Sequence, residues 1–186
     1  MSAFFWRWLG LFAACFILAS CIEVEDFGAY WDEGTLDPGL AGAWYSKKDT
    51  QCTLITEQDA DYLMLTDQEE NTARTLSLNG HAFLMIKKDG EIGGELLRYT
   101  LTKDTLTFYQ LNEAKKDAFE RAHASPNIVI DSYGSVELPK SYTATIQKLD
   151  LETAALLQQI AGDPSYWKPI EPLLRRADCG PSDDKH

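Results

Sequence analysis

The stretch from residue 40 to residue 111 consists of short runs of alternating apolar and polar residues separated by turn signals. Residues 105–111 show the pattern most clearly, because Leu106 and Phe108 lie on one face of an extended chain and the residues between them lie on the other. A period of two is typical of a strand with one buried face. Several such strands at short spacing predict a small antiparallel β-barrel or sandwich.

Turn residues separate the expected strands. Asn79-Gly80 and Asp89-Gly90 are hairpin signals, and Gly93-Gly94 is interpreted as a strand bend or bulge. A final pair of strands is expected late in the chain. The expected strands are residues 40–46, 52–56, 62–66, 73–78, 82–87, 95–102, 105–111, 127–130 and 142–149.

Two short helices are expected beside the strands. Asn112 can cap a helix over residues 113–122, and Asp150 can cap a second over residues 151–161, near the C-terminus, which Gly162 ends. Prolines then break the chain into short turns up to residue 174. The predicted fold class is therefore mainly β, with one or two helices.

The first 20 residues differ sharply from the rest, since Arg7 is their single charged residue and an apolar run follows it. This is the layout of a secretory signal. Leu18-Ala19-Ser20-Cys21 resembles the lipobox of bacterial lipoproteins. The resemblance implies a signal peptide over residues 1–20, cleavage between Ser20 and Cys21, and a diacylglycerol (with possible further acylation, such as palmitate) on Cys21.

In such lipoproteins an Asp directly after the lipidated cysteine favours the inner membrane, and Ile22 stands there instead. The resemblance therefore implies an anchor in the outer membrane, facing the periplasm. Two alternatives remain open. One is a plain secretory signal cut near Ala19, and the other is an uncleaved transmembrane anchor over residues 3–22, which is long enough to span a bilayer.

Four cysteines are present. With Cys15 in the signal and Cys21 lipidated, Cys52 and Cys179 remain, and two thiols in an oxidising compartment usually form a disulfide. Two buried free thiols are the alternative. A metal site is disfavoured, because isolated cysteines lack the paired spacing that zinc uses.

Removing residues 1–20 changes the net charge from -12 to -13. Residues 21–39 contain no basic residue and are interpreted as an acidic tether, in which Tyr30-Trp31 either docks on the domain or touches the membrane. The barrel domain is expected over residues 40–179, and a disordered tail over residues 180–186.

Leu40-Ala41-Gly42-Ala43-Trp44 resembles the Gly-x-Trp signature of lipocalin-like proteins. The resemblance implies a barrel whose first strand carries a tryptophan that closes one end. The family also has an arginine that packs on this tryptophan, and the sequence alone does not locate it.

Several aromatic side chains in the expected strands would point into such a barrel. They would line a ligand pocket if the interior is hollow, or fill a solid core, which is the commoner outcome in small barrels. The possible pocket residues are Trp44, Tyr62, Phe83, Tyr99 and Phe108.

No serine or cysteine hydrolase motif, calcium loop or phosphate-binding glycine loop is recognisable, so we expect no catalytic residue, metal site or cofactor. The acidic charge disfavours nucleic acid as a partner. The leading expectation is a non-enzymatic, lipid-anchored envelope protein that docks another envelope protein through a sheet edge or the segment after Leu149. A lipocalin-like carrier of a small apolar ligand and a hydrolase of unrecognised type are the alternatives.

Overall fold

The structure of the protein is a computed structural model. It describes residues 22–48, 50–59, 61–66, 69–88, 90–112, 115, 128–133, 141–147 and 149–176. The expected helix over residues 113–122 and the expected tail over residues 180–186 lie outside these described residues, apart from Lys115.

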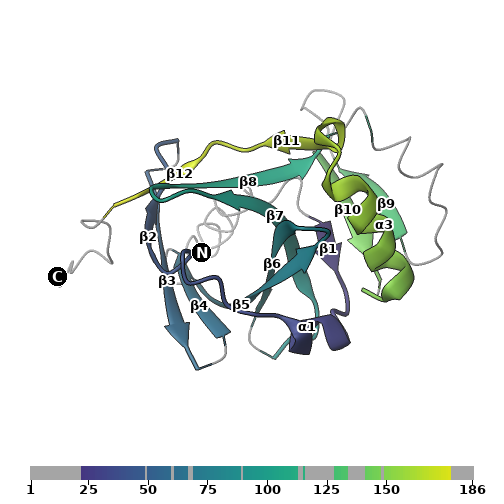
Figure 1. Cartoon of the computed structure of the whole chain (residues 1–186), viewed down its shortest axis with the longest axis horizontal. Helices are drawn as coiled ribbons and strands as arrows, with labels where there is room; N and C mark the ends of the chain where they lie inside the picture. The colour runs from purple at the N-terminus through teal and green to yellow at the C-terminus, as the bar shows by residue number, and fades with distance from the viewer. Residues whose placement is uncertain are drawn as a thin grey trace, which may run out of the picture.

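Within the described residues, eight antiparallel strands close into a barrel, which confirms the predicted fold class (Figure 1). Each strand pairs with the next along the chain from β2 to β8, and β12 closes the ring by pairing with both β8 and β2. The barrel strands are β2 (Gly42–Tyr45), β3 (Cys52–Gln58), β4 (Asp61–Thr66), β5 (Glu69–Leu78), β6 (His81–Lys88), β7 (Gly94–Leu101), β8 (Thr105–Leu111) and β12 (Leu173–Arg175).

The hairpin turns form where the turn residues predict them. Asn79 and Gly80 have positive φ angles of 51° and 76°, as a tight hairpin turn requires, and they join β5 to β6. Gly93 and Gly94 allow a close backbone approach. A Cβ on Gly93 would collide with the carbonyl oxygens of Val24 and Glu25, so this position requires glycine.

The eighth barrel strand was not predicted from the sequence. β12 and the short strand β11 (Trp167–Pro169) lie in the proline-rich stretch that we expected to form only turns. Both pair with β8, on either side of Ile170, whose amide donates to the Phe108 carbonyl at 2.8 Å. Pro169 is tolerated because β11 is an edge strand, and Pro172 lies just before β12 rather than within it.

The predicted final pair of strands forms, but it lies outside the barrel. β9 (Ile128–Tyr133) and β10 (Ser141–Ile146) are antiparallel, and β10 runs parallel to β1 (Ile22–Val24). Because β1 also pairs with β7, these strands extend the sheet beyond the barrel in the order β7, β1, β10, β9. Among the described strands β9 is therefore an edge.

The prediction of a tether over residues 21–39 is wrong for the described residues. Ile22 and Val24 are only 2% and 1% exposed within β1, and α1 (Ala29–Glu33) follows. Trp31 is buried, so Tyr30-Trp31 docks on the domain. In β1 the exposed Glu23 lies between the buried Ile22 and Val24. The tether prediction relied on the number of acidic residues, which does not reveal this alternation.

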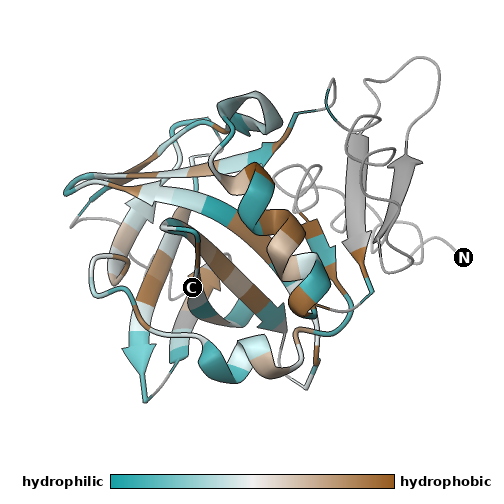
Figure 2. Ribbon diagram, turned by 45° about the vertical axis from the view of Figure 1, so that its right-hand side comes forward, coloured by the Kyte–Doolittle hydropathy of each residue, from teal (hydrophilic) through white to brown (hydrophobic). Residues whose placement is uncertain are grey.

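The second predicted helix is confirmed as α3 (Leu151–Ala161), with Asp150 accepting a hydrogen bond from the Thr153 amide at 2.9 Å. Figure 2 shows α3 lying across the outside of the barrel. Its buried residues pack on the outer face of the sheet together with Phe27 and Trp31 from the α1 region. The central strands are thus covered on both faces, by one apolar cluster inside the barrel and another outside it.

Candidate functional site: the barrel interior and the outer face

The structure brings four of the five predicted pocket residues together inside the barrel. Trp44, Tyr62 and Tyr99 belong to the inner cluster, and Phe108 packs against it while remaining partly exposed. Phe83 does not join them. It lies in the outer cluster, where its ring packs against Trp167 at a centroid distance of 5.8 Å. The adjacent Leu84 takes the inward position on β6.

One end of the barrel is closed by the segment that links α1 to β2. Figure 1 shows this segment crossing the barrel opening. Its Asp37 accepts hydrogen bonds from two interior tyrosines: the Tyr62 hydroxyl donates to the Asp37 carbonyl, and the Tyr99 hydroxyl donates to the carboxylate at 3.1 Å. Burial, followed by the negative charge of Asp37, raises the pKa of both tyrosines well above 10.0. These hydroxyls therefore act as neutral donors.

A tryptophan and an arginine complete this closed end. The Trp44 indole donates to the Leu40 carbonyl at 2.8 Å, and the Arg175 guanidinium lies 4.5 Å from the centre of the Trp44 ring. Arg175 also donates to the carbonyls of Gly39 and Ala41. Gly42 makes room for it, since a Cβ there would lie 2.8 Å from Arg175 Nη1. Arg175 thus joins the last barrel strand to the closing segment.

The closed end is filled by side chains. Trp44, Tyr62 and Leu106 are each 0% exposed, and a void large enough for water would leave accessible area on the residues that line it. Ile86, Phe108 and Leu173 border this cluster and remain partly exposed. This half of the barrel therefore serves as a core, and a ligand would have to enter near the partly exposed residues.

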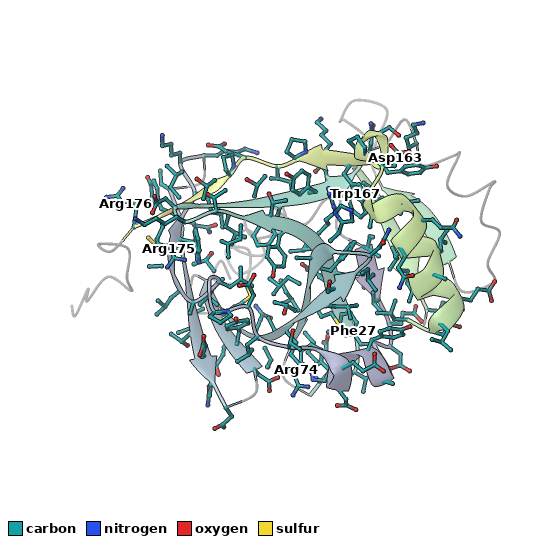
Figure 3. All side chains as sticks on the ribbon, in the orientation of Figure 1. Phe27, Arg74, Asp163, Trp167, Arg175 and Arg176 are labelled. Carbon is teal, nitrogen blue, oxygen red and sulfur yellow. The ribbon has the colours of Figure 1, made fainter. Side chains whose placement is uncertain are left out.

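On the outer face, Trp167 links β11 to α3. Its indole donates to the Ile160 carbonyl at 2.8 Å, and Figure 3 shows it between the sheet and the helix. The Arg98 guanidinium lies 5.4 Å from the Trp167 ring centre and 4.7 Å from that of Tyr109. Burial lowers the pKa of Arg98. Its Nη2 is 3.3 Å from Nδ1 of His81.

The sequence-predicted lipidation and cleavage residues, Cys21 and Ser20, lie outside the described residues. The structure does describe Ile22, which is the first residue of β1 and pairs with Leu96 and Ala144. If Cys21 carries a lipid, the folded sheet begins at the very next residue. Among the described residues, no helix is both long and apolar enough to cross a bilayer.

The Cys52–Cys179 disulfide stays a prediction, because Cys179 lies outside the described residues. The strand register is compatible with it. Arg175 pairs with Trp44, and Trp44 pairs with Thr53, the neighbour of Cys52. Two strand spacings separate Arg175 from Thr53, about 9.5 Å, and the four residues from Arg175 to Cys179 can span roughly 13 Å.

In the part of the chain that the structure describes, no group of three or more His, Cys, Asp or Glu side chains could hold a metal ion. His81 begins β6 and contacts Arg98, whereas His123 and His186 lie outside the described residues. Asp59 and the described acidic residues near it belong to no such group either.

Sequence reasoning missed Asp37, Arg98 and Arg175. Asp37 falls within the predicted tether. Arg98 falls within a predicted strand, where the alternating pattern identifies apolar residues only. The lipocalin resemblance implies an arginine that packs on Trp44. Arg175, in the short strand β12 after the prolines, is that arginine, and the resemblance was the signal that could have pointed to it. Neither Arg98 nor Asp37 had a comparable signal.

Comparisons with protein-family models, with curated proteins and with solved structures found no match for this chain.

Proposed function

We propose that this protein is a lipid-anchored, non-enzymatic component of the bacterial cell envelope that docks another envelope protein. The anchor is the acylated Cys21, in the outer membrane and facing the periplasm. The observation that carries the docking proposal is the extension of the sheet beyond the barrel. β1, which directly follows Cys21, joins β10 and the edge strand β9 to the barrel strand β7.

An edge strand has backbone donors and acceptors on one side that an added strand can pair with. The two ends of the described sheet are β9, which has six residues, and β11, which has three, so β9 is the longer edge. The filled closed end supports a role for the barrel as a scaffold rather than a container. We therefore place the partner strand at β9.

The anchor is tested by metabolic labelling with a palmitate analogue. The wild-type chain should be labelled and found in the membrane fraction, and Cys21→Ser should lose the label. Continued labelling of Cys21→Ser would overturn the lipoprotein assignment. A wild-type chain that is released without label would support the plain secretory signal instead.

Docking is tested by placing a photo-crosslinking amino acid at positions 129 and 131 of β9, with Ser77 as the control position. Ser77 is exposed on β5, where it pairs with Ala82 of β6 within the barrel. We expect one discrete crosslinked envelope protein from the β9 positions and none from position 77. Equal products from all three positions would contradict docking at β9.

A lipocalin-like carrier is the second candidate, and the Arg175–Trp44 contact favours it because an arginine on this tryptophan is a feature of that family. Its ligand would contact the partly exposed Ile86, Phe108 and Leu173. Native mass spectrometry of the purified protein should then show a co-purifying apolar molecule. A protein that is empty after gentle purification, and stays empty with added fatty acid, would eliminate the carrier.

A further inference from the structure

Arg98 lies where β7 changes partners. Its neighbour Leu96, two residues earlier on the same face, pairs with Ile22 of β1, whereas Arg98 itself pairs with Tyr109 of β8. The guanidinium is held between the rings of Tyr109 and Trp167 at 4.7 and 5.4 Å. Two aromatic faces therefore fix the position of a cation on the outer face of the barrel.

The hydrogen-bonding capacity of Arg98 is largely unused. Nε is buried without a partner, and Nη2 contacts only Nδ1 of His81 at 3.3 Å. Nη1 has no hydrogen-bond partner among the described residues, and none of their carboxylates pairs with Arg98. A guanidinium that is partly removed from water and lacks a counter-charge is unusual, because burying unpaired charge is costly.

Two other arginines also pack against a tryptophan ring, but their guanidinium groups have hydrogen-bond partners. Arg74 lies 5.3 Å from the Trp31 ring, and its Nε pairs with the Asp61 carboxylate. Arg175 lies over Trp44 and donates to two backbone carbonyls. Each of the three described tryptophans thus has an arginine against its ring, and Arg98 is the one whose guanidinium has neither carboxylate nor carbonyl among the described residues.

We propose that Arg98, with His81 beside it, binds a phosphate group, and that this group is the phosphate of a membrane phospholipid. The planar guanidinium presents paired N–H donors that match two oxygens of a phosphate. Arg98 remains partly exposed, and because Nε is buried, the anion would bind at the edge formed by Nη1 and Nη2. Because the aromatic rings pack against the guanidinium, the anion would bind at the edge that carries the N–H groups.

The position of Arg98 favours a lipid over free phosphate, and this assignment rests on the proposed lipid anchor. Ile22, the residue after Cys21, pairs with Leu96, which is two residues before Arg98 on β7. Two residues along a strand span only about 7 Å. An acyl chain on Cys21 would therefore bring the bilayer surface, with its phosphates, close to this guanidinium.

The test uses the full chain purified in dodecyl maltoside, a detergent without phosphate, and follows the melting temperature. At matched ionic strength, inorganic phosphate at about ten times its Kd should raise Tm by about 3–6 °C relative to chloride. Arg98→Gln should lose this shift. Arg74→Gln, which removes the arginine already paired with Asp61, should keep it.

Arg98→Lys provides a second variant that keeps the charge and the aliphatic stem, and its shift should be smaller than that of the wild type. Phosphatidylglycerol added to the micelles should raise Tm and remove the further response to inorganic phosphate. A response to inorganic phosphate alone would overturn the lipid assignment and support a free phosphate ligand. No response to either, or an equal response in Arg98→Gln, would overturn the site. Palmitate labelling reports separately on the anchor.

Discussion

The closed end of the barrel and its outer face both contain a tryptophan covered by an arginine, but the two regions use the pair differently. At the closed end, Arg175 lies over Trp44 and donates to the carbonyls of Gly39 and Ala41. On the outer face, Arg98 lies near Trp167 and leaves its Nε without a partner. Figure 3 shows Arg175 and Trp167 at opposite ends of the β12–β11 stretch.

The difference shows which contact is structural. The Arg175 guanidinium stabilises the fold, because its donors bond backbone carbonyls of the segment that closes the barrel. A guanidinium without such partners contributes less to folding and retains the capacity to bind an anion. The tryptophan–arginine pair therefore stabilises the fold at the closed end, whereas on the outer face it is a candidate anion-binding site.

The largest expected effect is at the closed end. Trp44→Ala should lower the free energy of unfolding by about 3–5 kcal/mol, because a fully buried indole leaves a cavity that its neighbours cannot fill. Urea denaturation measures the change. A loss below about 1 kcal/mol would show that this end is loosely packed.

Comparing two arginine variants sharpens the contrast. Arg175→Met should cost about 1–2 kcal/mol, because it removes charged hydrogen bonds and a cation–π contact, although Arg175 is exposed. Arg98→Met should cost less than about 0.5 kcal/mol or stabilise the protein, because the loss of its contacts with the Tyr109 and Trp167 rings is offset by the removal of an unpaired buried donor. Parallel urea titrations without phosphate give both free energies of unfolding. Equal losses of stability in the two variants would show that the two arginines contribute equally to folding.

Alkaline pH should also act on the closed end. The raised pKa values of Tyr62 and Tyr99 mean that the unfolded chain loses these protons near pH 10.0, while the folded chain retains them to higher pH. Their stabilising effect is therefore fully present below pH 10.0 and declines as the pH rises above it. Tyr99→Phe should make the alkaline decline in Tm shallower, and an unchanged slope would contradict the assigned burial.

The most local effect is expected at the helix that covers the outer face. Asp150→Ala should cost about 1 kcal/mol, because it removes the N-cap hydrogen bond to Thr153. Hydrogen exchange should become faster in α3 while the β2–β5 amides remain unchanged. Faster exchange throughout the barrel would show that the two regions unfold together.

The barrel was predictable from residues 40–111 because alternation and turn chemistry are local signals. Every expected strand in this stretch is present, and Asp150 caps α3 as expected. Strands β1, β11 and β12 were missed because each has only three residues and depends on partners distant in the sequence. Trp44, Tyr62, Tyr99 and Phe108 lie together at the inner cluster, whereas Phe83 lies in the outer one, because β6 is apolar on both faces and alternation cannot then identify the inner face.

The central claim is that the folded sheet begins immediately after the proposed lipid-bearing residue, so that no spacer separates the domain from the bilayer. Hydrogen–deuterium exchange of the segment from Ile22 to Phe27 tests it most directly. The ladder to β7 and β10, the Glu25 amide bonded to the Ile146 carbonyl at 2.8 Å and the Phe27 amide bonded to the Ile92 carbonyl predict slow exchange, comparable to that of β7. Exchange at the rate of an unstructured peptide would contradict this claim and would support the prediction of a tether over residues 21–39.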